Sequence, residues 1–269
     1  MALPARTHTP YDAPGPFRAA ALAPGDRYEL HDGHAIYCAP TGGDGARGTV
    51  AGAQVLDTDP AVTEAGIDAG YSAGPKDLRA PDVSVGNVPD KPGWIQGVPP
   101  LALEYAGAGQ DEAGLQSKIA DLLDAGTRWI WVVRLLGPRR VEVYEKGKAT
   151  RTFGPGEELL APGILQNPVV VEALFDRAVA HRLTFRNLLQ REGYESLDAV
   201  REEGREEGRE EGRDEGREEG RARAVLAVLA ARSIAVPAEV AARILACRDA
   251  ATLDGWLARA ATAERLADV

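Results

Sequence analysis

Apolar and polar residues alternate in several short runs along the first part of the chain, which is the pattern of half-buried β-strands. The first run, RYELHDGHAIYCA, surrounds Asp32-Gly33, and an Asp-Gly pair between two alternating runs predicts a β-hairpin. Two further runs, PDVSV from Pro81 and PLALEYA beyond it, predict core strands. RWIWVVRLL and RRVEVYEKG predict a pair of strands joined by a turn at Gly137-Pro138.

Helical spacing of apolar residues interrupts this series of strands. In DEAGLQSKIADLLDAG, Leu115, Ile119 and Leu122 recur every three or four residues, and Gly126 is a typical helix stop. A Gly- and Ala-rich segment that follows the hairpin has weak periodicity, and we expect a short helix near residues 50–56. The order of hairpin, strand, strand, helix, strand and strand predicts a mixed sheet with a helix packed on it, an α/β fold.

Beyond Leu174 the pattern becomes helical and includes a repeat. Residues 201–220 are five tandem tetrapeptides, REEG REEG REEG RDEG REEG. In a helix this repeat places like charges at i,i+4, which destabilises the helix, while Glu–Arg pairs at i,i+3 offset part of this repulsion. Each Gly lowers the stability of the helix by about 1 kcal/mol. We expect a marginal helix that is either a solvated linker or a helical oligomerisation arm. The tail that follows predicts three short helices, one with an apolar stripe at Leu253 and Leu257.

These changes of pattern divide the chain into four parts. We expect a flexible, proline-rich arm over residues 1–24 and an α/β domain over residues 25–180. A charged helical linker over residues 181–221 and a small helical tail over residues 222–269 complete the chain.

Composition narrows the class of protein. A chain of 269 residues with 44% hydrophobic content holds one domain of ordinary size and an appendage. The net charge of −10 argues against a protein that coats nucleic acid, but not against an enzyme with a local basic groove. Cys38 and Cys247 offer neither metal-site spacing nor a disulfide framework. No stretch approaches the roughly 20 apolar residues of a membrane helix, so we expect a cytoplasmic protein with no membrane partner.

Three residues of the α/β domain are suited to hydrolysing a phosphodiester. Asp82 opens one strand, and Glu104 interrupts the apolar strand LALEYA, where a buried carboxylate is costly unless it is paired or binds a cation. Lys118 lies on the following helix, in a chain that strongly prefers arginine. Carboxylate oxygens are ligands that Mg²⁺ prefers, and a lysine can position the attacking water and offset negative charge.

At these residues the sequence resembles the Uma-two family, a branch of the PD-(D/E)XK nuclease superfamily. The runs APDVSV, PPLALEYA, LQSK, DAG and WIWVV follow the family's order, and RYELHDGHAIY and RRVEVYEKGKATRTF resemble its opening hairpin and closing strands. The resemblance implies a restriction-endonuclease-like mixed sheet flanked by helices, with DNA as substrate. It also implies Asp82 and Glu104 as ligands of Mg²⁺ or Mn²⁺. Lys118 would replace the lysine that the superfamily usually carries at the position of Ala106.

Several positions depart from the family's pattern. Residues 107–109 replace a Ser-Pro-Ser segment, and Arg134 stands where an aspartate ends the Trp-containing strand. Gly114 and Leu122 replace an acidic residue and a tyrosine near Lys118. The alternative hypothesis is therefore a catalytically inactive nuclease-fold protein that forms homo-oligomers through its C-terminal helices.

Other residues are weaker candidates. Glu29 is a candidate additional carboxylate at the edge of the site. His31 and His34 flank the hairpin turn, and their spacing alone is a weak indication of a metal site. Trp129 and Trp131 point to one face of a strand, where core packing is favoured over stacking on nucleic-acid bases.

Overall fold

The computed structural model describes residues 15–109 and 111–269. The chain divides into two compact units, residues 1–195 and 196–269. Each unit has a hydrophobic core of its own. In the part of the chain that is described, no helix is both long enough and apolar enough to cross a membrane.

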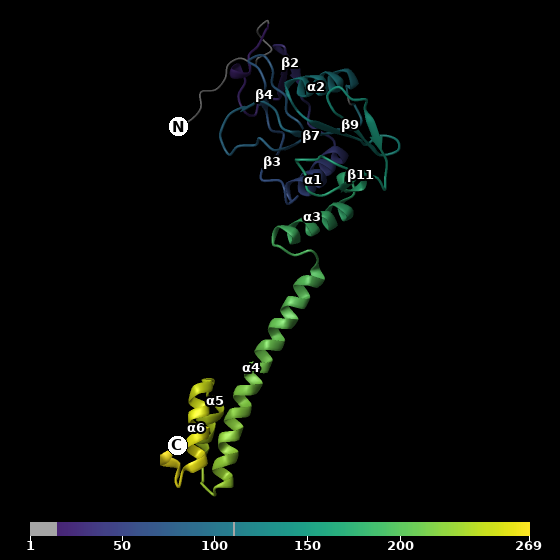
Figure 1. Ribbon diagram of the computed structural model, residues 1–269. Coiled ribbons are helices and arrows are strands. Elements are labelled where there is room, and N and C mark those ends of the chain that lie inside the picture. The colour runs from purple at the N-terminus through teal and green to yellow at the C-terminus, as the bar shows by residue number, and fades with distance from the viewer. Residues whose placement is uncertain (1–14, 110) are drawn as a thin grey trace. The chain divides into compact units, whose positions relative to one another are not determined.

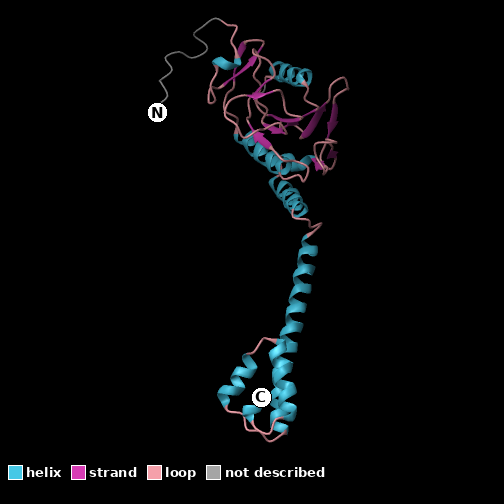
Figure 2. Ribbon diagram, turned by 60° about the vertical axis from the view of Figure 1, so that its left-hand side comes forward, coloured by secondary structure: helices cyan, strands magenta, loops and turns pink. Residues whose placement is uncertain are grey.

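A six-stranded mixed sheet forms the centre of the first unit (Figures 1 and 2). Its strand order is β10-β9-β8-β7-β5-β3, in which only the pair β7 and β8 is parallel. The strands are β3 (Ala65–Ile67), β5 (Val83–Val85), β7 (Leu101–Ala106), β8 (Trp129–Arg134), β9 (Arg140–Tyr144) and β10 (Arg151–Phe153). Since parallel neighbours need a crossover, the helix between β7 and β8 lies against the sheet, as the apolar spacing predicts.

Different helices cover the two faces of this sheet. They are α1 (Gly43–Asp57), α2 (Glu112–Ala125) and α3 (Arg177–Arg191), with a 3₁₀ turn, η3 (Val171–Leu174). The larger cluster lies on the face of Leu103 and Trp131, where α1, η3 and α3 pack. α2 packs on the opposite face, with Ile119 against Ala102 and Ile130. The predicted fold class, a mixed sheet flanked by helices with a helical C-terminal region, is confirmed.

Helix α1 is longer than the short helix expected near residues 50–56. Its glycines lower helix propensity, but they also allow close approach to the sheet. A Cβ at Gly48 would lie 2.6 Å from Cε1 of Tyr105, and Gly52 has the same ring and Leu103 as neighbours. Tertiary packing against β7 therefore stabilises a helix that the local sequence alone favours weakly.

The predicted hairpin is present as β1 (Tyr28–His31) and β2 (His34–Tyr37). Asp32 and Gly33 both have positive φ, 43° and 77°, as a two-residue type I′ turn requires. The hairpin forms its own two-stranded sheet rather than an edge of the central one. Further two-stranded sheets are formed by β4 (Tyr71–Ser72) with β6 (Ile95–Gln96) and by β11 (Glu158–Leu159) with β12 (Val169–Val170).

The segment predicted to be a flexible arm differs in its second part. Residues 1–14 lie outside the described residues. From residue 15 onward the chain packs on the hairpin, because Ala19 and Leu22 are buried beside Leu30. Trp94 Nε1 donates to the carbonyl oxygens of Ala19 and Leu22, 3.0 and 3.3 Å away.

The second unit consists of α4 (Leu197–Ala231), α5 (Ala238–Ala246), α6 (Ala250–Thr262) and the turn η4 (Leu266–Asp268). The tail's first predicted helix is continuous with the repeat instead of separate from it. Val225 and Leu229 of α4 are buried against Leu253 of α6, which anchors the C-terminal end of the long helix. Along the exposed repeat, i,i+3 ion pairs such as Arg205–Glu202, 3.4 Å, support the helix.

Candidate active site

Asp82 and Glu104 lie on neighbouring strands at the same level of the sheet. The antiparallel register of β5 and β7 pairs Val83 with Leu103, so Asp82, one residue before β5, comes opposite Glu104. Oδ2 of Asp82 accepts a hydrogen bond from the backbone N–H of Tyr105, 2.6 Å away. Because directly opposed residues share one face of a sheet, both carboxyl groups lie on the face that α2 covers.

Lys118 reaches this pair from α2. It lies between Leu115 and Leu122 at helical spacing, and both leucines are buried against the sheet. Its Nζ atom is 2.8 Å from Oε1 of Glu104 and 3.0 Å from Oε1 of Glu29, and it donates to the carbonyl oxygen of Ala80 at 2.7 Å. The structure therefore brings together the three site residues chosen from the sequence, and Glu29, the weaker candidate, contacts Lys118 as well.

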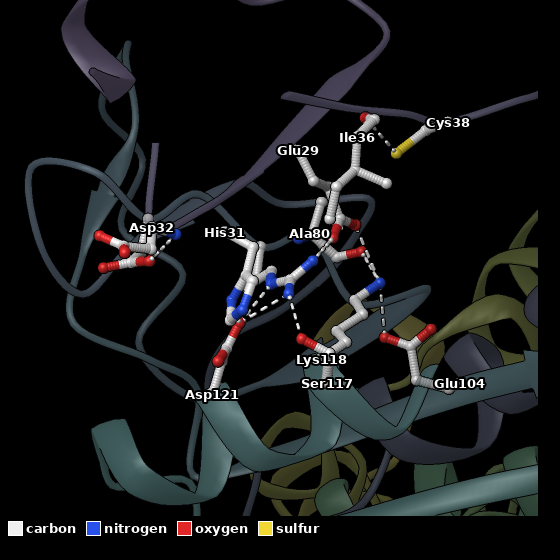
Figure 3. Close-up of polar contacts among 12 residues, drawn as sticks. Glu29, His31, Asp32, Ile36, Cys38, Ala80, Glu104, Ser117, Lys118 and Asp121 are labelled. Atoms are coloured by element: carbon white, nitrogen blue, oxygen red, sulfur yellow. Dashed lines mark hydrogen bonds and ion pairs between the residues drawn. The ribbon is translucent and has the colours of Figure 1, made fainter. Parts of the chain in front are cut away.

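Glu29 belongs to a wider charged network between the hairpin and α2 (Figure 3). Glu29 and His31 leave the same side of β1 and meet Lys118 and Asp121, one turn apart on α2. Arg79 lies between the two pairs. Its Nη1 atom is 3.1 Å from Oε2 of Glu29, and its Nε and Nη2 atoms donate to Oδ2 of Asp121 at 2.8 and 2.6 Å.

Burial and charge shift the proton affinities in the site. Burial raises the pKa of Glu104 to about 8, since the attraction of Lys118 only partly offsets desolvation and Asp82 adds repulsion. Burial likewise raises the pKa of Asp82. For Lys118, desolvation opposes the charged form, but Glu104, Glu29 and Asp82 outweigh it and raise the pKa above its usual range. The Lys118 ammonium therefore stays charged. Its single positive charge does not offset the desolvation of the Asp82 and Glu104 carboxyl groups.

The donor set suits a hard divalent cation with few protein ligands. Oε1 of Glu104 is buried and accepts no hydrogen bond from the described residues, although the Lys118 ammonium forms an ion pair with it. Within the described ranges, no group of three or more His, Cys, Asp or Glu side chains is arranged to hold a metal. Asp82 and Glu104 fit Mg²⁺, which is commonly bound by one or two carboxylates, with water and substrate phosphate as further ligands.

Asp68 is a residue of this neighbourhood that the sequence did not reveal. Ile67 of β3 pairs with Val83, so Asp68 follows opposite Asp82, and its backbone N–H donates to the carbonyl oxygen of Asp82 at 3.4 Å. Burial raises the pKa of the Asp68 side chain. Strand β3 spans only Ala65–Ile67 and contains a glycine, which leaves no alternating pattern to recognise.

Arg134, which departs from the pattern of the family that the sequence resembles, has partners of its own. Its Nη1 and Nη2 atoms donate to both carboxylate oxygens of Glu112 at 2.7 and 2.9 Å, and its Nε donates to Glu142 at 2.9 Å. Together with Gly107 and Arg140 it lines a pocket of about 260 Å³ beside the end of β7. An aspartate here would face two glutamates, so the change to arginine matches its local surroundings.

The two tryptophans of β8 take the positions expected of core residues. Trp131 is fully buried, and Trp129 packs against the same cluster while also lining a pocket of about 400 Å³ with Phe153. His34 is exposed, whereas His31 contacts Asp121, and within the described residues neither histidine belongs to a group of three or more side chains that could hold a metal ion.

Known proteins resemble this chain in fold. No protein-family model matches the sequence, and no curated protein matches it. Among solved structures, the chain is similar to one from Anabaena variabilis described as a "putative nuclease belonging to DUF820". The two are 18% identical, with a TM-score of 0.53 over 61% of this chain and 99% of that chain. At this identity the likeness shows a shared α/β fold, which spans nearly the whole of the Anabaena protein.

Proposed function

We propose that this protein is a metal-dependent DNA endonuclease of the Uma-two type. The observation that carries the proposal is the convergence of Asp82, Glu104 and the Lys118 ammonium on one face of a sheet whose fold is shared with a nuclease-like protein. Two adjacent carboxyl groups and one ammonium are a sufficient set for phosphodiester hydrolysis. The sequence order of strand, strand and helix leads to the same assignment.

Each residue has a distinct role in the proposal. Asp82 and Glu104 would hold Mg²⁺ or Mn²⁺, which when bound supplies a more acidic water and neutralises charge on the phosphate. Tyr105 N–H fixes the orientation of Asp82 through its 2.6 Å hydrogen bond. Lys118 would direct an N–H toward the attacking water or the scissile phosphate, exchanging one of its present partners for it.

Cleavage of plasmid DNA in Mg²⁺ or Mn²⁺ tests the proposal. The informative variant is Asp82→Asn, because its side-chain oxygen can still accept from Tyr105 N–H while the ligand charge is lost. We expect a loss of more than about 100-fold, since removing groups that only support metal ligands already costs 10–100-fold. Asp32→Asn is a matched control, an exposed carboxylate of the hairpin that pairs with Lys76. Equal cleavage by wild type and Asp82→Asn would refute the assignment.

One observation favours the alternative, a nuclease fold retained without catalysis. The Lys118 ammonium already forms ion pairs with Glu29 and Glu104 and donates a hydrogen bond to the carbonyl oxygen of Ala80. In an inactive scaffold this arrangement would be a purely structural ion cluster. Calorimetric titration with Mn²⁺ distinguishes the two, because a structural cluster predicts no saturable binding and no effect of Asp82→Asn.

A further inference from the structure

The Lys118 ammonium lies between two carboxylates whose surroundings differ. Glu104 lies beside Asp82 and is the predicted cation ligand, 2.8 Å from Nζ. Glu29, 3.0 Å from Nζ, comes from the hairpin and approaches from the other side, as Figure 3 shows. Lys118 therefore has one carboxylate partner inside the proposed metal site and another outside it.

Glu29 is fixed by contacts that do not involve the proposed metal site. Its Oε2 atom accepts from Arg79 at 3.1 Å, and its Oε1 atom accepts from the backbone N–H of Ala80 at 3.3 Å. Arg79 is in turn held by Asp121 and by the Ser117 hydroxyl at 3.2 Å. Glu29 and Arg79 are only 7% and 4% exposed, so this framework is buried.

We infer that Glu29 is a positioning residue that retains the Lys118 ammonium in the site when a divalent cation occupies Asp82 and Glu104. This inference rests on the proposed function. A cation shares the charge of Glu104 and repels the ammonium, so the hold of Glu104 on Lys118 weakens. Without Glu29 the ammonium would keep only the neutral carbonyl oxygen of Ala80 as an anchor, and the long, flexible Lys118 side chain would turn toward solvent.

The contacts of Glu29 distinguish this role from that of a third metal ligand. Both of its oxygens are occupied by Lys118, Arg79 and Ala80 N–H. In the described part of the chain, it joins no group of three side chains arranged around a cation position. Its carboxylate therefore acts on the reaction through Lys118.

Trace acetylation with acetic anhydride, read by mass spectrometry, measures how firmly the Lys118 amine is held. Exposed Lys91 serves as the internal reference in the full-length protein. In wild type we expect Lys118 to label slowly both without and with Mn²⁺. In Glu29→Gln we expect labelling to rise about tenfold, the effect of losing one charged hydrogen bond, and to rise further on adding Mn²⁺. Asp32→Asn should match wild type.

Activity provides a second readout. Glu29→Gln should lower kcat by roughly 10–100-fold and leave KM nearly unchanged, because Glu29 touches neither metal nor substrate in this role. Glu29→Asp retains the negative charge but moves it away from Lys118 by one methylene. Labelling of Lys118 in this variant should lie between that of wild type and that of Glu29→Gln, and it tests the inference if the glutamine variant does not fold.

Labelling of Lys118 tests the positioning role, whereas Mn²⁺ binding and DNA cleavage by wild type test the proposed function. If wild type binds Mn²⁺ and cleaves DNA but Lys118 labels alike in wild type and both Glu29 variants, the inference is overturned and the function stands. If wild type neither binds Mn²⁺ nor cleaves DNA, the proposed function fails, and the positioning role fails with it.

Discussion

At the residue scale, the proton on Glu104 competes with any cation for the same oxygens. Burial raises the pKa of Glu104 to about 8, so its carboxyl group holds a proton at higher pH than an exposed glutamate does, even with the Lys118 ammonium beside it. A cation must displace that proton, and binding is therefore opposed below this pKa and unopposed above it. We predict that Mn²⁺ affinity rises with pH, by up to about tenfold per unit below pH 8, and levels off above it.

Calorimetry in two buffers of different ionisation enthalpy would measure both the affinity and the proton released. Close to one proton should leave per cation at pH 7, and almost none at pH 9, because Glu104 is by then ionised. The Glu104→Gln variant has no proton to release, and its residual binding should lose this pH dependence. Affinity that is constant between pH 6 and pH 9 in wild type would contradict the assignment of Glu104.

The site could be predicted from the sequence only where a residue departs from its local pattern. Glu104 interrupts an apolar strand and Lys118 is a lysine in an arginine-rich chain, but each is a weak signal alone, and only their order with Asp82 along strand, strand and helix predicts a site. Arg79 and Asp121 carry no such signal, because a charged residue in a loop or on a helix surface is ordinary. Their role follows from packing of the hairpin against α2, a long-range contact that no local pattern encodes.

At the scale of elements, glycine has opposite effects in α1 and α4. Gly48 of α1 faces Tyr105, where an added Cβ would lie 2.6 Å from a ring carbon. Gly208 and Gly212 of α4 have no atom within 4 Å of such a Cβ. The local residue type is the same, but the surroundings decide whether alanine is accommodated.

We predict opposite changes in stability for alanine at these positions. Gly48→Ala should destabilise the first unit by about 1–2 kcal/mol, since overpacking outweighs the gain in helix propensity. Gly208→Ala should stabilise α4 by up to about 1 kcal/mol. Urea unfolding followed by circular dichroism measures both. A stabilising Gly48→Ala would mean that α1 does not pack on β7 as described.

The same comparison explains which elements were predictable. The apolar run of β7 and the helical spacing of α2 predict both elements within a residue or two of their observed bounds. The sequence predicts an α1 that is too short, because its glycines lower helix propensity and the close approach of Gly48 and Gly52 to Tyr105 is a tertiary contact. Propensity alone predicts a marginal helix for the repeat, whereas its helix continues into turns that bury Val225 and Leu229.

At the scale of the whole molecule, the two units are independent in their cores. The clusters of the first unit contain no residue beyond Leu183, and the cluster of the second begins at Ala222. We predict that the chain shortened to residues 1–195 folds with an unchanged thermal transition and retains the site around Lys118. Loss of cooperative unfolding in the shortened chain would show that the first unit depends on the second.

We further propose that the second unit assembles the protein. The turns of α4 over residues 201–216 bury no side chain, and glycines within such a charged helix leave it marginal unless it is supported. A second copy of the same helix would supply Arg and Glu partners along residues 201–220. We therefore expect light scattering to give a mass above one chain for full-length protein and one chain for residues 1–195.

A third variant, in addition to the full-length protein and residues 1–195, identifies which part of the second unit forms the oligomer. Deletion of residues 201–220 removes the repeat but keeps the packed helices around Leu229 and Leu253. If the repeat drives assembly, this chain should be monomeric, and in full-length protein raised salt should weaken the association by screening exposed ion pairs such as Arg205–Glu202. An oligomer that survives the deletion would place the interface on α5 and α6 instead. A monomeric full-length chain would leave the repeat as a solvated linker.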